Sequence, residues 1–184
     1  MMVNLTQIQQ QLAAQSAQPP LHLWQPDYSG EIDIKISRSG DWFHEGERIE
    51  RASLVKLFAS ILRREEDGHY YLLTPVEKWR IKVEECALIV TDVEVVNSVD
   101  GVQQLWFTTN AENQYLISKE LPLVVETAQT ATGLEILPRI MLPNCLSAKL
   151  TRSVYYRLVD IAAVRDGQLQ VESEGSEFIL GSCD

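Results

Sequence analysis

Isoleucine alternates strictly with polar residues between Glu31 and Ser37, and this alternation constrains the fold more than any other feature of the sequence. Successive side chains of a β-strand point to opposite faces of a sheet, so Ile32, Ile34 and Ile36 share one face. The pattern predicts a strand that is buried on one side, and therefore a sheet with an apolar face.

A helix is predicted to follow, from about Arg51 to the Asp67-Gly68 pair. Its apolar residues recur at the spacing i, i+3, i+4, i+7 and i+8, which places them on one helix face. Glycine accepts the left-handed conformation in which many helices end, so Gly68 is the expected stop. Arg63 and Arg64 are expected on the solvent side. The apolar face consists of Leu54, Leu57, Phe58, Ile61 and Leu62.

Strands are predicted on both sides of this helix, at residues 42–44, 69–73 and 79–84. The chain then continues with β-branched and aromatic runs that are separated by turn signals such as Asp100-Gly101. These runs predict an antiparallel meander in the middle of the chain.

A second helix is predicted from Ser147, which can cap it, to about Val164, and the Asp166-Gly167 pair is its expected stop. An alternating strand follows. A helix ended by Asp-Gly and followed by such a strand thus occurs twice, which favours an internal duplication. The alternative is that an Asp-Gly pair is common after helices and does not require a duplication.

The first 20 residues predict a short amphipathic arm. Asn4 can cap a helix in which Leu5, Ile8 and Leu12 form an apolar stripe, and two prolines end it. The arm is expected to dock on the body of the protein or on a partner. The predicted organisation is an N-terminal helical arm (1–20), an N-terminal α+β domain (21–82) and a C-terminal α+β domain (83–184).

The composition narrows the class of protein. A chain of 184 residues with 45% hydrophobic content is expected to be globular. A net charge of −10 argues against nonspecific binding of nucleic acid or anionic membranes, because attraction to phosphate needs a basic surface. No signal-peptide pattern or membrane-spanning apolar stretch is present in the sequence. We expect a cytoplasmic protein with three reduced cysteines and no metal site.

The sequence lacks the motifs of common catalytic and nucleotide sites, since it contains no GxSxG, no GxxxxGK[ST] and no GxGxxG. This favours a non-enzymatic role. The alternative is an enzyme that uses Glu77, His44 or Asp41 as acid or base, and such an enzyme would need a dry, carboxylate-lined cleft.

The most site-like segment is the turn from Thr74 to Lys78, which contains Pro75 and Glu77. It presents a hydroxyl, a carboxylate and an ammonium group from a backbone that proline restricts, as a binding loop does. The alternative is a solvated turn with a weak ion pair between Glu77 and Lys78.

Aromatic and basic residues supply further candidates. His44 lies beside Trp42 and can stack on a base-like ring or bond to it, although a partly buried histidine with a backbone partner is the plainer interpretation. Arginine is the preferred planar donor for phosphate, and a helix N-terminus also favours anions. Ordinary surface charge is the alternative for these residues. The basic candidates for an anion pocket are Arg48, Arg51, Arg139, Lys149 and Arg152.

Residues 41–62 and 67–84 resemble a proteobacterial family, the Domain of Unknown Function 1285 family. They read DWFHEGERIERASLVKLFASIL and DGHYYLLTPVEKWRIKVE. The resemblance implies a duplicated α+β core, a C-terminal domain similar to a pleckstrin-homology fold, a nucleotide-like ligand at the domain interface and a role in signalling. The positions that match the family are Trp42, His44, Gly46, Arg51, Leu57, Phe58, Thr74, Pro75, Glu77 and Lys78.

The sequence therefore predicts an α+β protein of two related strand-helix-strand units with largely antiparallel sheets, whose C-terminal half resembles a pleckstrin-homology-like barrel. The predicted function is a non-enzymatic sensor of a nucleotide-like anion in signal transduction. The alternative is a protein-interaction or scaffold module that contacts a protein partner or forms a homodimer. The predicted ligand-binding residues are Trp42, His44, Arg51, Thr74, Glu77, Lys78, Arg139 and Arg152.

Overall fold

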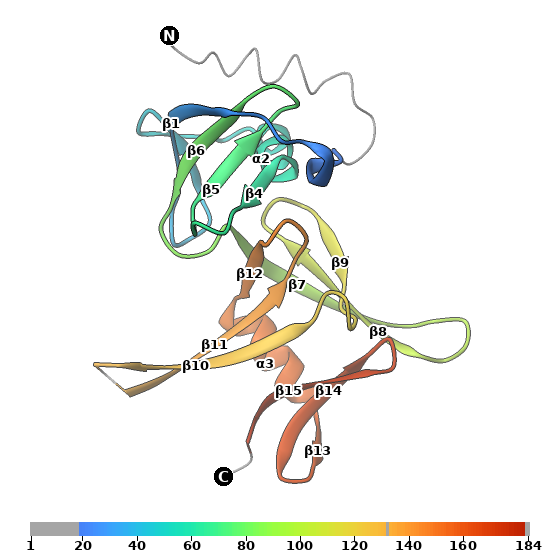
Figure 1. The fold of residues 1–184 in the computed structure, drawn as a ribbon. Coiled ribbons are helices and arrows are strands. Elements are labelled where there is room, and N and C mark those ends of the chain that lie inside the picture. Colours follow the sequence, from blue (N-terminus) through green and yellow to red (C-terminus); the bar gives the residue numbers. More distant parts are fainter. Residues whose placement is uncertain (1–18, 132, 183–184) are drawn as a thin grey trace. The chain divides into compact units, whose positions relative to one another are not determined.

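The computed structural model describes residues 19–131 and 133–182 (Figure 1). The helix predicted for the N-terminal arm lies outside these residues. The chain divides into two compact units. The N-terminal unit extends to Ala87 and includes Asn144–Leu146, and the C-terminal unit consists of Leu88–Pro143 and the chain from Ser147 onward.

The N-terminal unit contains a six-stranded mixed sheet with the strand order β3-β2-β1-β6-β5-β4. Strands β1 and β6 are parallel, and all other neighbours are antiparallel. A short 3-10 helix, η1, and one α-helix, α2, complete the described part of this unit. The elements are η1 Leu21–Leu23, β1 Tyr28–Ile36, β2 Trp42–His44, β3 Glu47–Arg48, α2 Ala52–Ser60, β4 Leu62–Arg64, β5 Tyr70–Leu73 and β6 Lys78–Val83.

The core of this unit lies on the face predicted from the alternation in β1. Ile32, Ile34 and Ile36 are all buried, which confirms the prediction. Phe58 of α2 is also buried, and its ring stacks on Trp42 with 6.1 Å between the ring centroids. Each such side chain contributes about 1.5–3 kcal/mol through removal of apolar surface from water.

The first helix is shorter than predicted, because α2 ends at Ser60. Ile61 and Leu62 are both fully buried, as the helical spacing predicted, but they lie beyond the end of the helix. Leu62 begins β4, which pairs with β5 in an antiparallel hairpin. Gly68 therefore forms part of the turn between two strands, where the N–H of Gly68 donates to the carbonyl of Glu65.

The C-terminal unit contains a six-stranded mixed sheet, β10-β11-β12-β7-β8-β9, and a three-stranded sheet, β13-β14-β15. Strands β7 and β12 are parallel, and the other neighbours are antiparallel. The elements are β7 Leu88–Asn97, β8 Gln103–Thr109, β9 Gln114–Leu116, β10 Leu123–Thr130, β11 Gly133–Met141, β12 Ser147–Leu150, α3 Arg152–Ile161, β13 Ala163–Arg165, β14 Gln168–Ser173 and β15 Ser176–Ser182.

The second helix begins later than predicted. Ser147 opens β12, which pairs on both sides, and the cap of α3 is Thr151, whose hydroxyl accepts a bond from the N–H of Val154. The buried residues Ala148 and Leu150 alternate along β12, so sheet pairing outweighs the helical pattern here. Asp166-Gly167 connects β13 and β14 and does not cap the helix.

The two units share one sequence of elements, which supports the predicted duplication. In each unit an α-helix leads into a three-residue strand, an Asp-Gly turn and an antiparallel return strand. Each also contains one parallel strand pair, β1 with β6 and β7 with β12. Both six-stranded sheets are open in the described part of the chain, with β3 and β4 or β10 and β9 at their edges, so neither forms a closed barrel.

Candidate functional site

The predicted turn between Thr74 and Lys78 joins β5 to β6 and is held by its own hydrogen bonds. Thr74 is buried, and its hydroxyl accepts from the N–H of Glu77 at 3.0 Å. The N–H of Thr74 in turn donates to the carbonyl of Glu77 at 2.9 Å. The threonine hydroxyl is therefore engaged in closing the turn.

The other N-terminal candidates lie apart from this turn in the sheet order. Trp42 is 1% exposed in the core, so its ring is not available to stack on a ligand. His44 is half-buried at the end of β2, next to the turn into β3. Arg51 is exposed at the residue before α2, and its side chain makes no capping bond.

Arg139 and Arg152 belong to the C-terminal unit. Arg139 lies on β11, where its Nε is 3.6 Å from Oε2 of Glu126, and it pairs with Lys149 across the β11–β12 ladder. Arg152 is the exposed first residue of α3. The structure thus places Arg139 beside Lys149. The six predicted ligand-binding residues other than Arg139 and Arg152 belong to the N-terminal unit.

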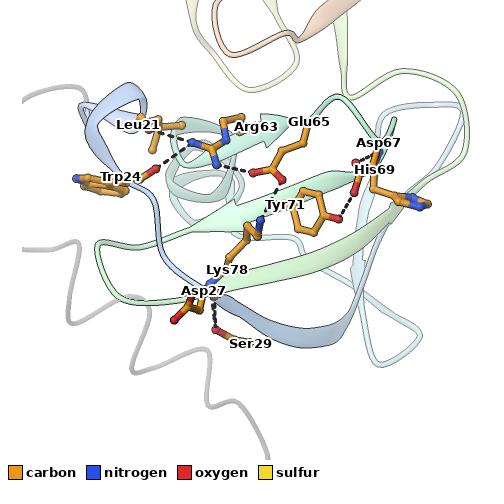
Figure 2. A network of polar contacts seen from close by, with 10 residues as sticks. All are labelled: Leu21, Trp24, Asp27, Ser29, Arg63, Glu65, Asp67, His69, Tyr71 and Lys78. Carbon is orange, nitrogen blue, oxygen red and sulfur yellow. Dashed lines mark hydrogen bonds and ion pairs between the residues drawn. The ribbon is translucent and has the colours of Figure 1, made fainter.

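A partly buried polar network occupies the N-terminal unit (Figure 2). The Arg63 guanidinium donates to the carbonyls of Leu21 and Trp24 at 3.2 and 3.1 Å and is ion-paired with Glu65. The second oxygen of Glu65 accepts from Nζ of Lys78 at 3.0 Å. Arg63 therefore fastens the segment around η1 to the edge strand β4.

Arg63 is the clearest correction to the sequence analysis, which expected it on the solvent side of a helix. Its side chain is 14% exposed, because it belongs to β4 and points to the sheet face opposite that of Leu62. Arg63 is largely buried because the chain changes from helix to strand at Ile61. The helical spacing of the apolar residues continues through Leu62, so the sequence pattern did not indicate this change.

The electrostatics of the network favour a charged Glu65. Burial alone would raise the pKa of its carboxyl, but the hydrogen bonds from Arg63 and Lys78 and their positive charges outweigh burial and lower it. Glu65 lies between two cations, so the three charged groups together carry one net positive charge. Lys78 also lies over the ring of Tyr71, 5.0 Å from its centroid, which orients the ammonium group further.

A second set of hydrogen bonds in Figure 2 joins Tyr71, Asp67 and His69. The Tyr71 hydroxyl donates to Oδ2 of Asp67 at 2.6 Å, and Oδ1 of Asp67 accepts from the N–H of His69 at 2.9 Å. The hydrogen bond from Tyr71 and that from the His69 backbone lower the pKa of Asp67. The same bond to Asp67, together with burial, raises the pKa of Tyr71 to about 12.

This pair predicts a loss of stability at high pH. A Tyr71 pKa raised from 10.0 to about 12 means that the folded protein favours the neutral phenol. The neutral phenol therefore contributes its full share of the folding stability below pH 10, and this share is lost between about pH 10 and pH 12. Asp67→Asn is expected to lower the pKa of Tyr71. The measurement is an NMR titration of ¹³C-labelled tyrosine rings, with Tyr71→Phe to assign the signal. If Tyr71 has the same pKa in Asp67→Asn as in the unmodified protein, Asp67 is not the cause of the raised Tyr71 pKa and the prediction is wrong.

A cavity of about 350 Å³ opens beside Gly68 and His69, in the turn between β4 and β5. The pairing of β1 with β6 is irregular near this cavity. We call it the N-terminal hollow. Two strands contribute its charged groups, Glu31 from β1 and Arg80 and Lys82 from β6, and Glu31 and Arg80 form an ion pair. Lys82 is exposed and has no ion-pair partner among the described residues. The lining consists of Glu31, Ile32, Gly68, His69, Tyr70, Arg80, Ile81, Lys82 and Val83.

The N-terminal hollow can hold an anion more readily than it can perform acid-base chemistry. Lys82, Arg80 and His69 supply hydrogen-bond donors, whereas the one carboxylate in the lining is paired with Arg80. These residues did not enter the predicted site. A signal for them exists in the sequence, because Lys78, Arg80 and Lys82 occupy alternate positions of β6 and so share one sheet face.

Two classes of feature are missing from the part of the chain that the structure describes. In residues 19–131 and 133–182, no three histidine, cysteine, aspartate or glutamate side chains are grouped so that they can hold a metal ion. Over the same residues, no helix combines the length and the apolar character that crossing a membrane requires.

Comparisons with known proteins place both halves of the chain in one family. Residues 19–86 match the model described as "Domain of unknown function (DUF1285), N-terminal domain", and residues 87–180 match "Protein of unknown function (DUF1285), C-terminal domain". None of the curated proteins matches the chain.

Two solved structures are similar to this chain. A DUF1285 family protein from Silicibacter pomeroyi DSS-3 is 38% identical, with 91% of this chain and 90% of that chain covered and a TM-score of 0.79. A DUF1285 family protein from Shewanella baltica OS155 is 30% identical, with 69% of this chain and 90% of that chain covered and a TM-score of 0.53. The first similarity extends over both units.

Proposed function

The chain belongs to the DUF1285 family, whose function is unknown, and we propose that it is a non-enzymatic protein that binds a small phosphate-bearing anion in the N-terminal hollow. The observation that carries this proposal is Lys82, which has no ion-pair partner among the described residues and lies next to Arg80 in a concave part of the sheet. Three of the nine lining residues are basic or imidazole side chains, and one is acidic.

The size of the hollow supports a small ligand. A cavity of about 350 Å³ lies at the lower end of the ~300–1,000 Å³ that small-molecule sites occupy. Tyr70 and the apolar residues Ile32, Ile81 and Val83 supply the nonpolar part of the lining. A phosphate group with a modest organic portion therefore fits both the volume and the mixture of polar and apolar groups.

The charges of the lining determine how such an anion would be held. Lys82 supplies a point charge that no ion pair within the described residues neutralises, and Arg80 is the planar donor that suits phosphate oxygens. Glu31 disfavours an anion, but its pairing with Arg80 offsets that effect. A bound phosphate would share Arg80 with Glu31, and Lys82 would then supply most of the net attraction.

The finer features of the function are parts of this proposal. A nucleotide-like ligand, a signalling role and a pleckstrin-homology-like C-terminal half stay predictions that the family resemblance supports. The polar network does not supply the anion site, because Lys78 is already paired with Glu65. The N-terminal hollow is therefore the place that we assign to the ligand.

The test is a binding experiment with inorganic phosphate, nucleoside monophosphates and cyclic nucleotides, read by thermal shift and isothermal titration calorimetry. We expect at least one of these compounds to raise the melting temperature. Lys82→Gln is expected to weaken its binding about tenfold or more, since a charge-assisted hydrogen bond contributes about 1.5–3 kcal/mol.

The matched control is Lys56→Gln, which removes the same charge from the exposed side of α2 in the same unit. It is expected to leave binding within about twofold, because an exposed charge outside the site acts only through screened long-range attraction. Equal weakening by both variants would point to nonspecific attraction. The absence of any shift with every compound would remove the proposed function.

A further inference from the structure

We propose that a pocket in the C-terminal unit binds a small primary alkylamine, with the carboxylate of Glu172 as the partner of its ammonium group. This inference does not depend on the proposed anion site, which belongs to the other unit. It rests on a cavity between three strands, on a carboxylate without an ion pair among the described residues, and on a buried amide oxygen without a donor among them.

The pocket lies at the small sheet of the C-terminal unit and has a volume of about 140 Å³. Strands β13, β14 and β15 supply most of its lining, and the last residue of α3 and the first residue of β8 also contribute. The register of β14 against β15 shifts between Leu169 and Gln170, beside the pocket, and such irregularities are frequent next to functional sites. We call this space the C-terminal pocket, and its lining includes Ile161, Ala163, Arg165, Gln170, Glu172 and Glu177.

Two carboxylates of the C-terminal pocket face each other across β14 and β15. Glu172 and Glu177 are directly opposite in the strand pairing, and like charges in this position destabilise a sheet. Arg165 forms an ion pair with Glu177. Glu172 is half-buried and has no ion-pair partner among the described residues. The lining therefore carries one negative charge that no cation of the described chain offsets.

The side-chain amide of Gln170 provides a second acceptor. Gln170 and Glu172 occupy alternate positions of β14, so their side chains share one sheet face. Nε2 of Gln170 donates to Oε1 of Gln168 at 3.4 Å, whereas Oε1 of Gln170 is buried and has no hydrogen-bond partner among the described residues. A buried carbonyl oxygen without a donor costs free energy, so a ligand that supplies a donor here gains binding energy.

A primary ammonium group supplies what both acceptors lack. It carries one positive charge and three N–H donors and has no acceptor of its own, as the side chain of lysine shows. One donor would form a charge-assisted bond to Glu172, and a second would reach Oε1 of Gln170. The net charge of −10 on the chain also attracts cations from solution.

The size and composition of the C-terminal pocket select a short alkylamine over other cations. Its volume of about 140 Å³ equals that of about four to five water molecules at ~30 Å³ each. Ile161 and Ala163 offer apolar contact to a short alkyl chain. A hard metal ion takes about six or more oxygen ligands, and in residues 19–131 and 133–182 no three acidic, histidine or cysteine side chains are grouped to hold one.

The experiment is an NMR titration of the full ¹⁵N-labelled chain with n-propylammonium chloride, and with tetramethylammonium chloride as a cation that has no N–H donor. We expect saturable shifts of the backbone amides of Ala163, Gln170 and Glu172 with propylammonium and none with tetramethylammonium. Glu172→Gln is expected to weaken binding about tenfold or more, because a charge-assisted hydrogen bond is lost. The matched variant Glu94→Gln removes an exposed carboxylate from β7 in the same unit, and binding is expected to stay within about twofold.

Three outcomes would overturn the inference. The first is the absence of saturable shifts with propylammonium, which would leave the C-terminal pocket to water. The second is an equal response to tetramethylammonium, and the third is equal weakening by Glu172→Gln and Glu94→Gln; both would reduce the effect to general attraction of cations. Far-UV circular dichroism and the melting temperature establish that each variant is folded. Gln170→Met, which removes the second acceptor, is expected to weaken binding as well and repeats the test if Glu172→Gln does not fold.

Discussion

Arg63→Ala is expected to lower the free energy of unfolding of the N-terminal unit by about 3 kcal/mol, since removing one partner of a partly buried ionic network leaves the others desolvated and unpaired. The carbonyls of Leu21 and Trp24 lose their common donor, and Glu65 loses one of its two cations. Leu21 is 1% exposed, so the segment that contains it gives up buried apolar surface when it is released.

The control for this prediction is the neighbouring residue. Arg64 is exposed and lies over the ring of Tyr70 at 5.6 Å, a contact worth about 0.5–1 kcal/mol at a surface site. Arg64→Ala is therefore expected to cost less than about 1 kcal/mol. Urea unfolding followed by tryptophan fluorescence measures both, because Trp24, Trp42 and Trp79 are in the N-terminal unit. Equal costs for the two variants would contradict the structural role of Arg63.

Gly30→Ala is expected to destabilise the N-terminal unit by a similar amount, about 3 kcal/mol, for two separable reasons. Gly30 has a φ of +131°, which residues with a side chain rarely adopt, and such a conformation costs about 1–3 kcal/mol. An added Cβ would also lie 3.2 Å from Cζ3 of Trp79, in the strand beside it. Overpacking of this kind costs about 1–3 kcal/mol.

A second glycine separates these two causes. Gly133 has the same φ of +131°, but an added Cβ there would meet no atom within 4 Å. Gly133→Ala is thus expected to cost only the conformational part, about 1–2 kcal/mol. Urea unfolding followed by far-UV circular dichroism gives both values. A cost at Gly30 no larger than that at Gly133 would show that contact with Trp79 is unimportant.

Sequence periodicity predicted the sheet well where one face of a strand is buried and the other is not. The alternation of Ile32, Ile34 and Ile36 led directly to the core of the N-terminal unit. Periodicity was wrong where a helix runs into a strand without a loop. Ile61 and Leu62 continue the helical spacing of α2, yet the hairpin of β4 and β5 needs Leu62 as its first residue.

The candidate site was harder to predict because it depends on the pairing of strands distant in the sequence. Arg63 was expected on the solvent side of a helix, and only strand pairing brings Lys78 and Tyr71 close to Arg63 and Glu65. Glu31 and Arg80 likewise meet because β1 and β6 are parallel neighbours. The sequence pattern at Thr74 predicted a turn, and the Thr74 hydroxyl accepts a hydrogen bond that closes this turn.

The most direct measurement of the anion site is an NMR titration of ¹⁵N-labelled protein with inorganic phosphate and with a nucleoside monophosphate. The proposed function predicts saturable shifts of the backbone amides of His69, Arg80 and Lys82, reduced in Lys82→Gln and preserved in Lys56→Gln. Saturable shifts that avoid these three residues, or no shifts at millimolar ligand, would contradict the assignment of the anion site to the N-terminal hollow.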